Sequence, residues 1–223
     1  MANVGRPREH DERTGALLLA AAERVVEAEG QQALSLRRIA VEAKTTTRAV
    51  YSLFGSADAL RAALGARAFL LLGAGVEALA RSDDPIADLV EAGLVFRQFA
   101  TAHRALFGLA VQMTQTSPSV ATRFRSARGQ ALASLRARIE RLEARGLLGG
   151  RSVREAVFAF HALCEGLAAV ELRHLMPQGE EADLWRSALT ALVTGFAGSR
   201  PTPRGRSKVV RGGAREGRKV GSR

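Results

Sequence analysis

Apolar residues recur along most of this chain with the spacing of an amphipathic helix. Positions i, i+3, i+4 and i+7 share one helix face, and between positions 11 and 29 this spacing is kept by Leu18, Ala21, Ala22 and Val25. Gly30 follows where a helix commonly ends, since glycine adopts a positive φ without steric penalty. No segment alternates apolar and polar residues as a β-strand would. The pattern predicts an all-α fold.

Two short helices are expected within residues 35–54, capped by Ser35 and Thr46. The apolar stripe of the first helix consists of Leu36, Ile39, Ala40 and Ala43. The second helix is expected to bury Ala49, Val50, Leu53 and Phe54. Its free side chains are Thr46, Thr47, Arg48 and Tyr51, which suits an element that lies in a DNA groove. Two short helices joined by a tight turn form a helix-turn-helix.

Together with its flanks, this segment resembles the TetR family of bacterial repressors. The shared features are an Ala-rich first helix ending at Gly30, the segment 36–40, the pair Val50–Tyr51, Phe54, and Ser56 before Asp58 and Leu60. The sequence departs from the family pattern at three positions. Lys44 stands where the turn usually has a glycine, Leu53 stands where a polar residue is common, and Ala57 stands where a basic residue is usual. Lys44 must therefore reach its turn conformation without the freedom of glycine at positive φ.

The resemblance implies a sequence-specific DNA-binding transcriptional regulator. It further implies a homodimeric repressor that binds a near-palindromic operator and is released by a small apolar ligand. The expected organisation is a flexible basic arm (1–10), a DNA-binding domain (11–60, with the helix-turn-helix at 35–54), a helical ligand-binding and dimerisation domain (61–198) and a disordered basic tail (199–223).

Six further helices are expected after the helix-turn-helix. Asp84 and Pro85 form a cap followed by a proline at the first helical position, and Ser152 with Glu155 has the spacing of a capping box. The expected ranges are about 56–80, 84–102, 104–114, 119–145, 152–176 and 181–197, which makes about nine helices in all.

The candidates for contacting DNA bases are Arg37, Thr47, Arg48 and Tyr51. Arginine can donate two hydrogen bonds to guanine, and a threonine methyl can contact a thymine methyl. The candidates for contacting phosphates are Lys44, Thr45, Thr46 and the Tyr51 hydroxyl. Arg6 and Arg8 resemble a basic arm that enters the minor groove, although a simple disordered terminus is equally compatible with them. An ordinary solvated helix face is the alternative for the helical residues.

In the TetR family, the helices after the DNA-binding domain surround a ligand pocket. The candidates for such a pocket are Phe69, Phe96, Phe99, His103, Phe107, Met113, Phe124, Phe158 and His161. Clustered phenylalanines favour an apolar ligand. The alternative is that these side chains only fill the core, as aromatic residues at helical spacing often do.

The last two expected helices have wide apolar faces, which usually require a partner. In TetR-like proteins this pair forms a four-helix interface with its two-fold mate. The candidate interface residues are Phe160, Leu163, Leu167, Val170, Trp185, Leu189, Leu192 and Phe196. Packing on the chain's own core could account for about half of them.

Several other classes of protein find no support. The sequence has no nucleotide-binding, serine-hydrolase or zinc-protease motif, so we expect neither an enzyme nor a cofactor. His161, Cys164 and Glu165 lie on adjacent turns but lack further ligands for a metal site. The single cysteine fits a reducing cytoplasm, and the most apolar stretch (62–80) contains Arg67 and Glu77, so we expect no membrane span.

The net charge of +11 is concentrated at the C-terminus. Residues 200–223 contain nine Lys or Arg and one acidic residue, which gives this segment a net charge of +8. The preceding residues together carry a net charge of only +3. A solvated tail of this composition cannot bury enough apolar surface to fold. The rival interpretation of the whole chain is therefore a sequence-independent nucleic-acid-binding or architectural protein driven by this tail.

Removing residues 200–223 distinguishes the two interpretations. We expect the truncated chain to bind operator and random DNA more weakly by similar factors, because the tail contacts phosphates without selecting bases. The dependence of log K on log salt concentration, measured by anisotropy titration, should become flatter as fewer counterions are released. Loss of operator preference with an unchanged salt slope would show that the tail selects bases.

Overall fold

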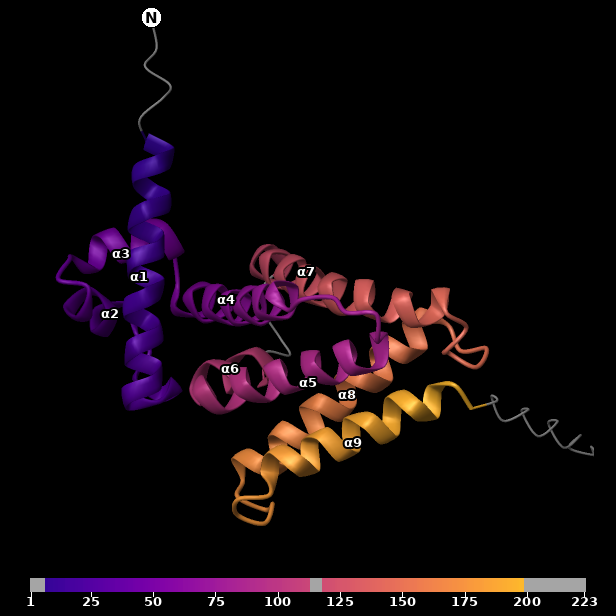
Figure 1. Ribbon diagram of the computed structural model, residues 1–223. Coiled ribbons are helices and arrows are strands. Elements are labelled where there is room, and N and C mark those ends of the chain that lie inside the picture. Colours follow the sequence, from indigo (N-terminus) through magenta and orange to yellow (C-terminus); the bar gives the residue numbers. More distant parts are fainter. Residues whose placement is uncertain (1–6, 113–117, 199–223) are drawn as a thin grey trace, which may run out of the picture.

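The structure, a computed structural model, describes residues 7–112 and 118–198, with the backbone alone at 7–12, 112 and 118–123. Over these ranges it contains nine α-helices, one short 3-10 helix and no strand, which confirms the predicted all-α fold (Figure 1). The elements are α1 (Pro7–Glu29), a 3-10 turn (Gln31–Ala33), α2 (Leu36–Glu42), α3 (Thr47–Phe54), α4 (Ala57–Ala78), α5 (Pro85–Ala102), α6 (Arg104–Gln112), α7 (Pro118–Ala144), α8 (Val153–Leu172) and α9 (Glu181–Phe196).

Two helix ends differ from the expected positions. Helix α1 begins at Pro7 rather than near residue 11, because proline is favoured at the first helical position and acidic residues follow it closely. Arg8 therefore lies in the first turn of α1 and not in an extended arm, while Arg6 lies outside the described residues. Helix α8 ends at Leu172 instead of 176, since His174 takes a positive φ of 56° and stops the helix.

The N-terminal helices share a core with parts of the following bundle. The predicted stripe of α1 is buried with Ile39 of α2 and Val50 of α3. The same cluster continues into α4 at Leu64 and into α6 at Leu106. The packing therefore does not divide at the expected domain boundary after residue 60, because α4 runs without a break from the helix-turn-helix into the bundle (Figure 1).

Hydrogen bonds join α1 to the bundle next to this shared core. The Glu27 carboxylate accepts from the backbone N–H groups of Ala105 (3.3 Å) and Leu106 (3.1 Å) in the first turn of α6. These groups have no partner within their own helix, so an acidic side chain at this end stabilises α6. One turn earlier, the Glu23 carboxylate accepts from Nε of Arg67 at 2.7 Å.

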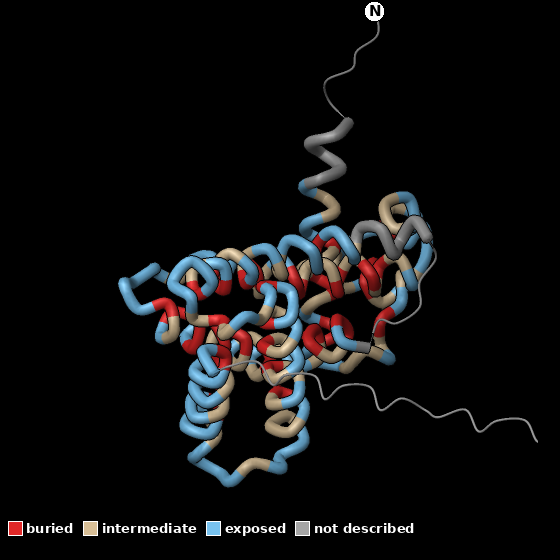
Figure 2. Tube along the Cα trace, turned by 90° about the vertical axis from the view of Figure 1, so that its right-hand side faces the viewer, coloured by how far each residue is buried: buried red, intermediate tan, exposed pale blue. Residues whose placement is uncertain are grey.

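The C-terminal helices pack around Phe96 and Trp185. The Trp185 side chain is fully buried, its ring centroid lies 6.3 Å from that of Phe96, and its indole N–H donates to Glu171 at 2.7 Å. Gly93 lets α5 approach α9 closely, because a Cβ there would come within 2.5 Å of a methyl group of Leu189. Buried residues line the spaces between the helices and the outer surfaces are exposed (Figure 2).

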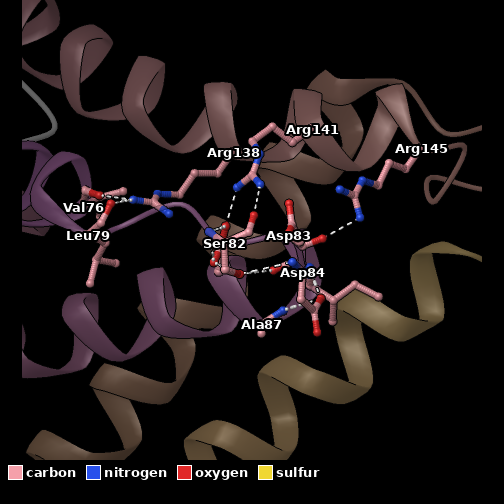
Figure 3. Close-up of polar contacts among 11 residues, drawn as sticks. Val76, Leu79, Ser82, Asp83, Asp84, Ala87, Arg138, Arg141 and Arg145 are labelled. Carbon is pink, nitrogen blue, oxygen red and sulfur yellow. Dashed lines mark hydrogen bonds and ion pairs between the residues drawn. The ribbon is translucent and has the colours of Figure 1, made fainter.

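Arg138 and Arg141 on α7, together with Arg145 directly after it, hold the segment that joins α4 to α5 (Figure 3). Nη2 of the buried Arg138 donates to the carbonyl oxygens of Val76 (2.6 Å), in the last turn of α4, and of Leu79 (2.8 Å), directly after it. Arg141 donates to the Ser82 carbonyl and to the Asp88 carboxylate. Asp84 caps α5 as expected and accepts from the Ile86 and Ala87 N–H groups. The C-terminal end of α4 is thereby fixed to α7.

Helix α4 is long and apolar enough, by length and composition, to cross a membrane, contrary to the expectation from residues 62–80. Half of its most apolar window is buried inside the protein, against α7 and α6 among others. This burial is that of a core helix, whose apolar side chains face other helices.

Asp88 should stabilise the fold only while it is ionised. Burial alone would raise the pKa of its carboxyl, but hydrogen bonds from Arg141 and Ser82 outweigh burial and hold the pKa below its usual value. The stabilisation is therefore present above the unfolded pKa of about 3.9 and is lost as the pH falls through the lower folded value.

We expect Asp88→Asn to reduce the free energy of unfolding by about 1–3 kcal/mol at pH 7, because Arg141 loses its charged partner. The loss should shrink under acid conditions, where Asp88 itself is protonated. Urea denaturation at several pH values measures both effects. Asp84→Asn is the matched control, since asparagine caps helices as well as aspartate does. Equal stability of the two variants at pH 7 would contradict the assignment.

Candidate nucleic-acid interface and ligand cavity

Both predicted caps of the helix-turn-helix are present. Ser35 Oγ accepts from the Arg38 N–H at 3.2 Å, and Thr46 Oγ1 accepts from the Ala49 N–H at 3.2 Å. In the turn between α2 and α3, Lys44 has a φ of 52°, as expected where the sequence lacks a glycine. The Thr45 N–H closes this turn by donating to the Ala40 carbonyl at 2.8 Å. The geometry of α3 thus follows from local interactions.

Helix α3 presents one polar face to solvent. Thr47, Arg48 and Tyr51 are exposed, the Tyr51 side chain at 62%, while Val50 on the opposite face is fully buried. The turn residues Lys44, Thr45 and Thr46 are exposed beside the N-terminus of α3, and Arg37 is exposed on α2. Among the described residues, no hydrogen bond or ion pair holds the side chains of Arg37, Lys44, Arg48 or Tyr51. This surface therefore carries cations without internal partners.

Arg38 differs from these cations, and the sequence interpretation did not single it out. Its Nε donates to Glu29 at 3.0 Å and its Nη1 to Glu42 at 3.2 Å. Arg24 also donates to Glu42, at 3.1 Å. The network fixes α2 against α1 behind the polar face of α3. The opposite charges of Arg38 and Glu42 four residues apart were the one sequence signal for it.

An internal apolar cavity of about 30 Å³ lies between α4, α5, α7 and α8. Phe69, Phe96 and His161, all predicted pocket residues, line it together with Cys164 and Phe160. Burial raises the pKa of the Cys164 thiol, which keeps it neutral. The cavity has room for about one or two water molecules, far less than the roughly 300–1,000 Å³ of a typical ligand pocket.

The other predicted pocket residues lie outside this cavity. Phe99 and Phe107 pack in the core, the Phe124 ring contacts that of Phe69, and His103 ends α5. Phe158 is 74% exposed, and Met113 lies outside the described residues. Helical spacing places these side chains on a face but does not fix which neighbours surround them.

The predicted dimer residues divide into two groups. Phe160, Trp185, Leu189 and Phe196 are buried within the chain's own core, so they are not available to a partner, and their assignment to an interface is wrong. Leu189 is buried because α5 packs closely across α9 at Gly93. The half-buried members are Leu163, Leu167, Val170 and Leu192.

Over the described ranges, no group of three or more His, Cys, Asp or Glu side chains could hold a metal ion.

The fold and the exposed α3 surface define a helix-turn-helix DNA-binding regulator. Residues 18–64 match the family model described as bacterial regulatory proteins, tetR family, and residues 89–192 match the tetracyclin repressor-like C-terminal domain. The chain therefore belongs to the tetR family of transcriptional regulators. None of the curated proteins that were compared matches this sequence significantly.

Solved structures share the fold at low sequence identity. A Rhodococcus sp. RHA1 protein of unknown function is 24% identical, with a TM-score of 0.73 over 87% of this chain and 100% of its own. The regulator PfmR of Thermus thermophilus is 20% identical, with a TM-score of 0.61 over 79% and 96%. GusR of Salmonella enterica is 19% identical, with a TM-score of 0.63 over 88% and 99%.

We expect Arg48→Ala and Tyr51→Ala each to weaken specific operator binding, since one good base contact is worth about 1–3 kcal/mol. The operator would first be selected from fragments of the source genome, and affinity would then be measured by anisotropy. Circular dichroism should be unchanged, because both side chains are exposed. Arg81→Ala, at an exposed arginine between α4 and α5, is the control. Wild-type affinity in both α3 variants would place the DNA-contacting surface elsewhere.

Proposed function

We propose that this protein is a homodimeric transcriptional repressor that leaves a near-palindromic operator when a small ligand binds its C-terminal bundle. The observation that carries the proposal is the capped helix α3, whose exposed face combines Arg48 and Tyr51 with no internal partner for either among the described residues. Two-fold symmetry would place two such helices in successive major-groove turns. Membership of the tetR family supports the DNA-binding part of this function.

The polar residues would divide their roles by position. Arg37, Thr47, Arg48 and Tyr51 would contact base edges, where arginine can bind guanine through two hydrogen bonds. Lys44, Thr45, Thr46 and the Tyr51 hydroxyl would contact phosphates near the N-terminus of α3, where the helix dipole favours anions. Arg6, which precedes α1 in the sequence, would contact the minor groove.

Dimerisation would use the outer faces of α8 and α9. The exposed residues there are mostly small, among them Ala162 and Gly166 on α8 and Ala191 and Gly195 on α9. Leu184 is 38% exposed on the same side of α9. Such a face lets two helix pairs approach closely, and the half-buried Leu163 and Val170 would complete the apolar seam. This face replaces the buried residues that were expected to form the interface.

Ligand binding would reach the DNA-binding helices through α6. The Phe96 ring lines the internal cavity and contacts the Phe107 ring of α6 edge-on at 5.7 Å. The adjacent residue, Leu106, donates its N–H to Glu27 of α1. A ligand larger than the cavity would displace Phe96 and shift α6 and α1 together. Release from DNA follows only if the ligand binds the shifted state more tightly.

We expect Ala191→Glu to convert the dimer to monomers, because it places a charge in an apolar interface, and to reduce operator affinity in consequence. Sedimentation at micromolar concentration measures the first effect and anisotropy the second. Val41→Glu, at an apolar residue 67% exposed on α2, is the control for the oligomeric state. A wild-type protein that sediments as a monomer would refute the dimer.

A further inference from the structure

A second hollow lies on the surface directly outside the internal cavity. It is a groove of about 430 Å³ between α7 and α8. Leu132 of α7 and His161 of α8 line both the groove and the internal cavity. The side chains of Leu132 and His161 therefore separate the groove from the internal cavity. If Leu132 and His161 turned aside, the groove and the cavity would become one pocket of ligand size.

The rim of the groove is cationic. Arg128 and Arg136 on α7 and Arg154 on α8 line it, and its lining contains no acidic residue among those described. Arg136 donates to Glu140 at 2.8 Å, whereas Arg128 and Arg154 make no hydrogen bond or ion pair with any described residue. Glu165 lies near Arg128. Contact with His161 and the charge of Arg128 lower the pKa of the Glu165 carboxyl, although its partial burial alone would raise it. The rim thus offers two guanidinium groups to an external anion.

The floor of the groove is apolar. It includes Leu132, Ala133, Val157 and Phe158, and Phe158 is the most exposed of the large apolar side chains among the described residues. Covering an exposed phenylalanine with an apolar ligand is favourable, because it removes apolar surface from water. His161 contributes a polar atom to the inner wall. Its Nε2 is buried and lies 3.1 Å from Oε1 of Glu165, but the angle between the two groups does not allow a hydrogen bond.

We propose that the ligand is an amphipathic organic anion, with an apolar chain or ring system and a carboxylate, that enters between α7 and α8. Its carboxylate would bind Arg128 and Arg154, whose planar guanidinium groups suit carboxylate oxygens. Its apolar part would cover Phe158 and pass Leu132 and His161 to reach Phe96 in the internal cavity. This inference rests on the proposed ligand-binding role of the bundle and names the chemistry of the ligand.

The single tryptophan reports on this site. Trp185 is the only tryptophan in the sequence, and its ring contacts Phe96, which lines the internal cavity. The full-length protein would be titrated with decanoate, decan-1-ol and decyltrimethylammonium below their micelle-forming concentrations, with tryptophan fluorescence as the readout and circular dichroism to verify folding. The three probes have unbranched alkyl chains of similar length, and their head groups are anionic, neutral and cationic, respectively.

We expect decanoate to bind about tenfold more tightly than decan-1-ol, a difference of about 1.4 kcal/mol, because hydrogen bonds between a guanidinium group and a carboxylate are stronger than those to a neutral hydroxyl. The cation should bind least. The double variant Arg128→Gln/Arg154→Gln should lose this advantage for decanoate and keep the affinity for decan-1-ol. The control, Arg81→Gln/Arg173→Gln, removes two arginines outside the groove and should bind decanoate normally.

Equal affinity for all three probes, or unchanged decanoate binding in the groove variant, would overturn the inference. Operator release is measured separately by anisotropy. Release by decan-1-ol without an advantage for decanoate would overturn the anionic ligand but support the ligand-released repressor. Arginine-dependent binding of decanoate that leaves the operator bound would support the site and count against release by its occupant.

Discussion

The Glu27 carboxylate joins the DNA-binding helices to the bundle by satisfying the first N–H groups of α6. Those groups have no partner inside α6, so the start of this helix is more stable when the Glu27 carboxylate accepts their hydrogen bonds than when Glu27 has moved away. Within α6, Leu106 packs in the N-terminal core and the next residue, Phe107, in the C-terminal core. Because consecutive residues of one short helix belong to both cores, α6 connects the packing of one core to that of the other. This constraint gives the two parts a physical route of communication.

Arginine serves two separate purposes in this chain. On α7, Arg138 and Arg141 are bound to backbone carbonyls and to Asp88, and there the rigid guanidinium fork holds the α4–α5 connection in place. Arg48 on α3 has no such partner among the described residues. With the far end of α4 fixed to α7, a shift of α6 and α1 would be taken up at the near end, beside the helix-turn-helix. The charge pattern thus separates groups that hold the fold from groups available to DNA.

The small volume of the internal cavity bears on how a ligand could act. A pocket already open to its full size would bind a ligand with little rearrangement and transmit little to α6. A cavity of about 30 Å³ requires Phe96 and its neighbours to move before a larger molecule can enter. Close-packed cores tend to switch between discrete arrangements instead of deforming gradually. A cavity of this size therefore suits a regulator whose two states differ in helix position.

The sequence by itself determined the all-α fold, the caps at Ser35 and Thr46 and the polar face of α3, because these depend on helical period and on contacts within a few residues. It could not determine which apolar residues of α8 and α9 face the chain's own core. Leu189 and Leu184 lie on the same short helix, yet one is fully buried and the other 38% exposed. Only the tertiary structure decided between them, since the close approach of α5 at Gly93 depends on residues far away in the chain. The same holds for Phe96 and Phe158, where packing placed one ring beside the internal cavity and the other in solvent.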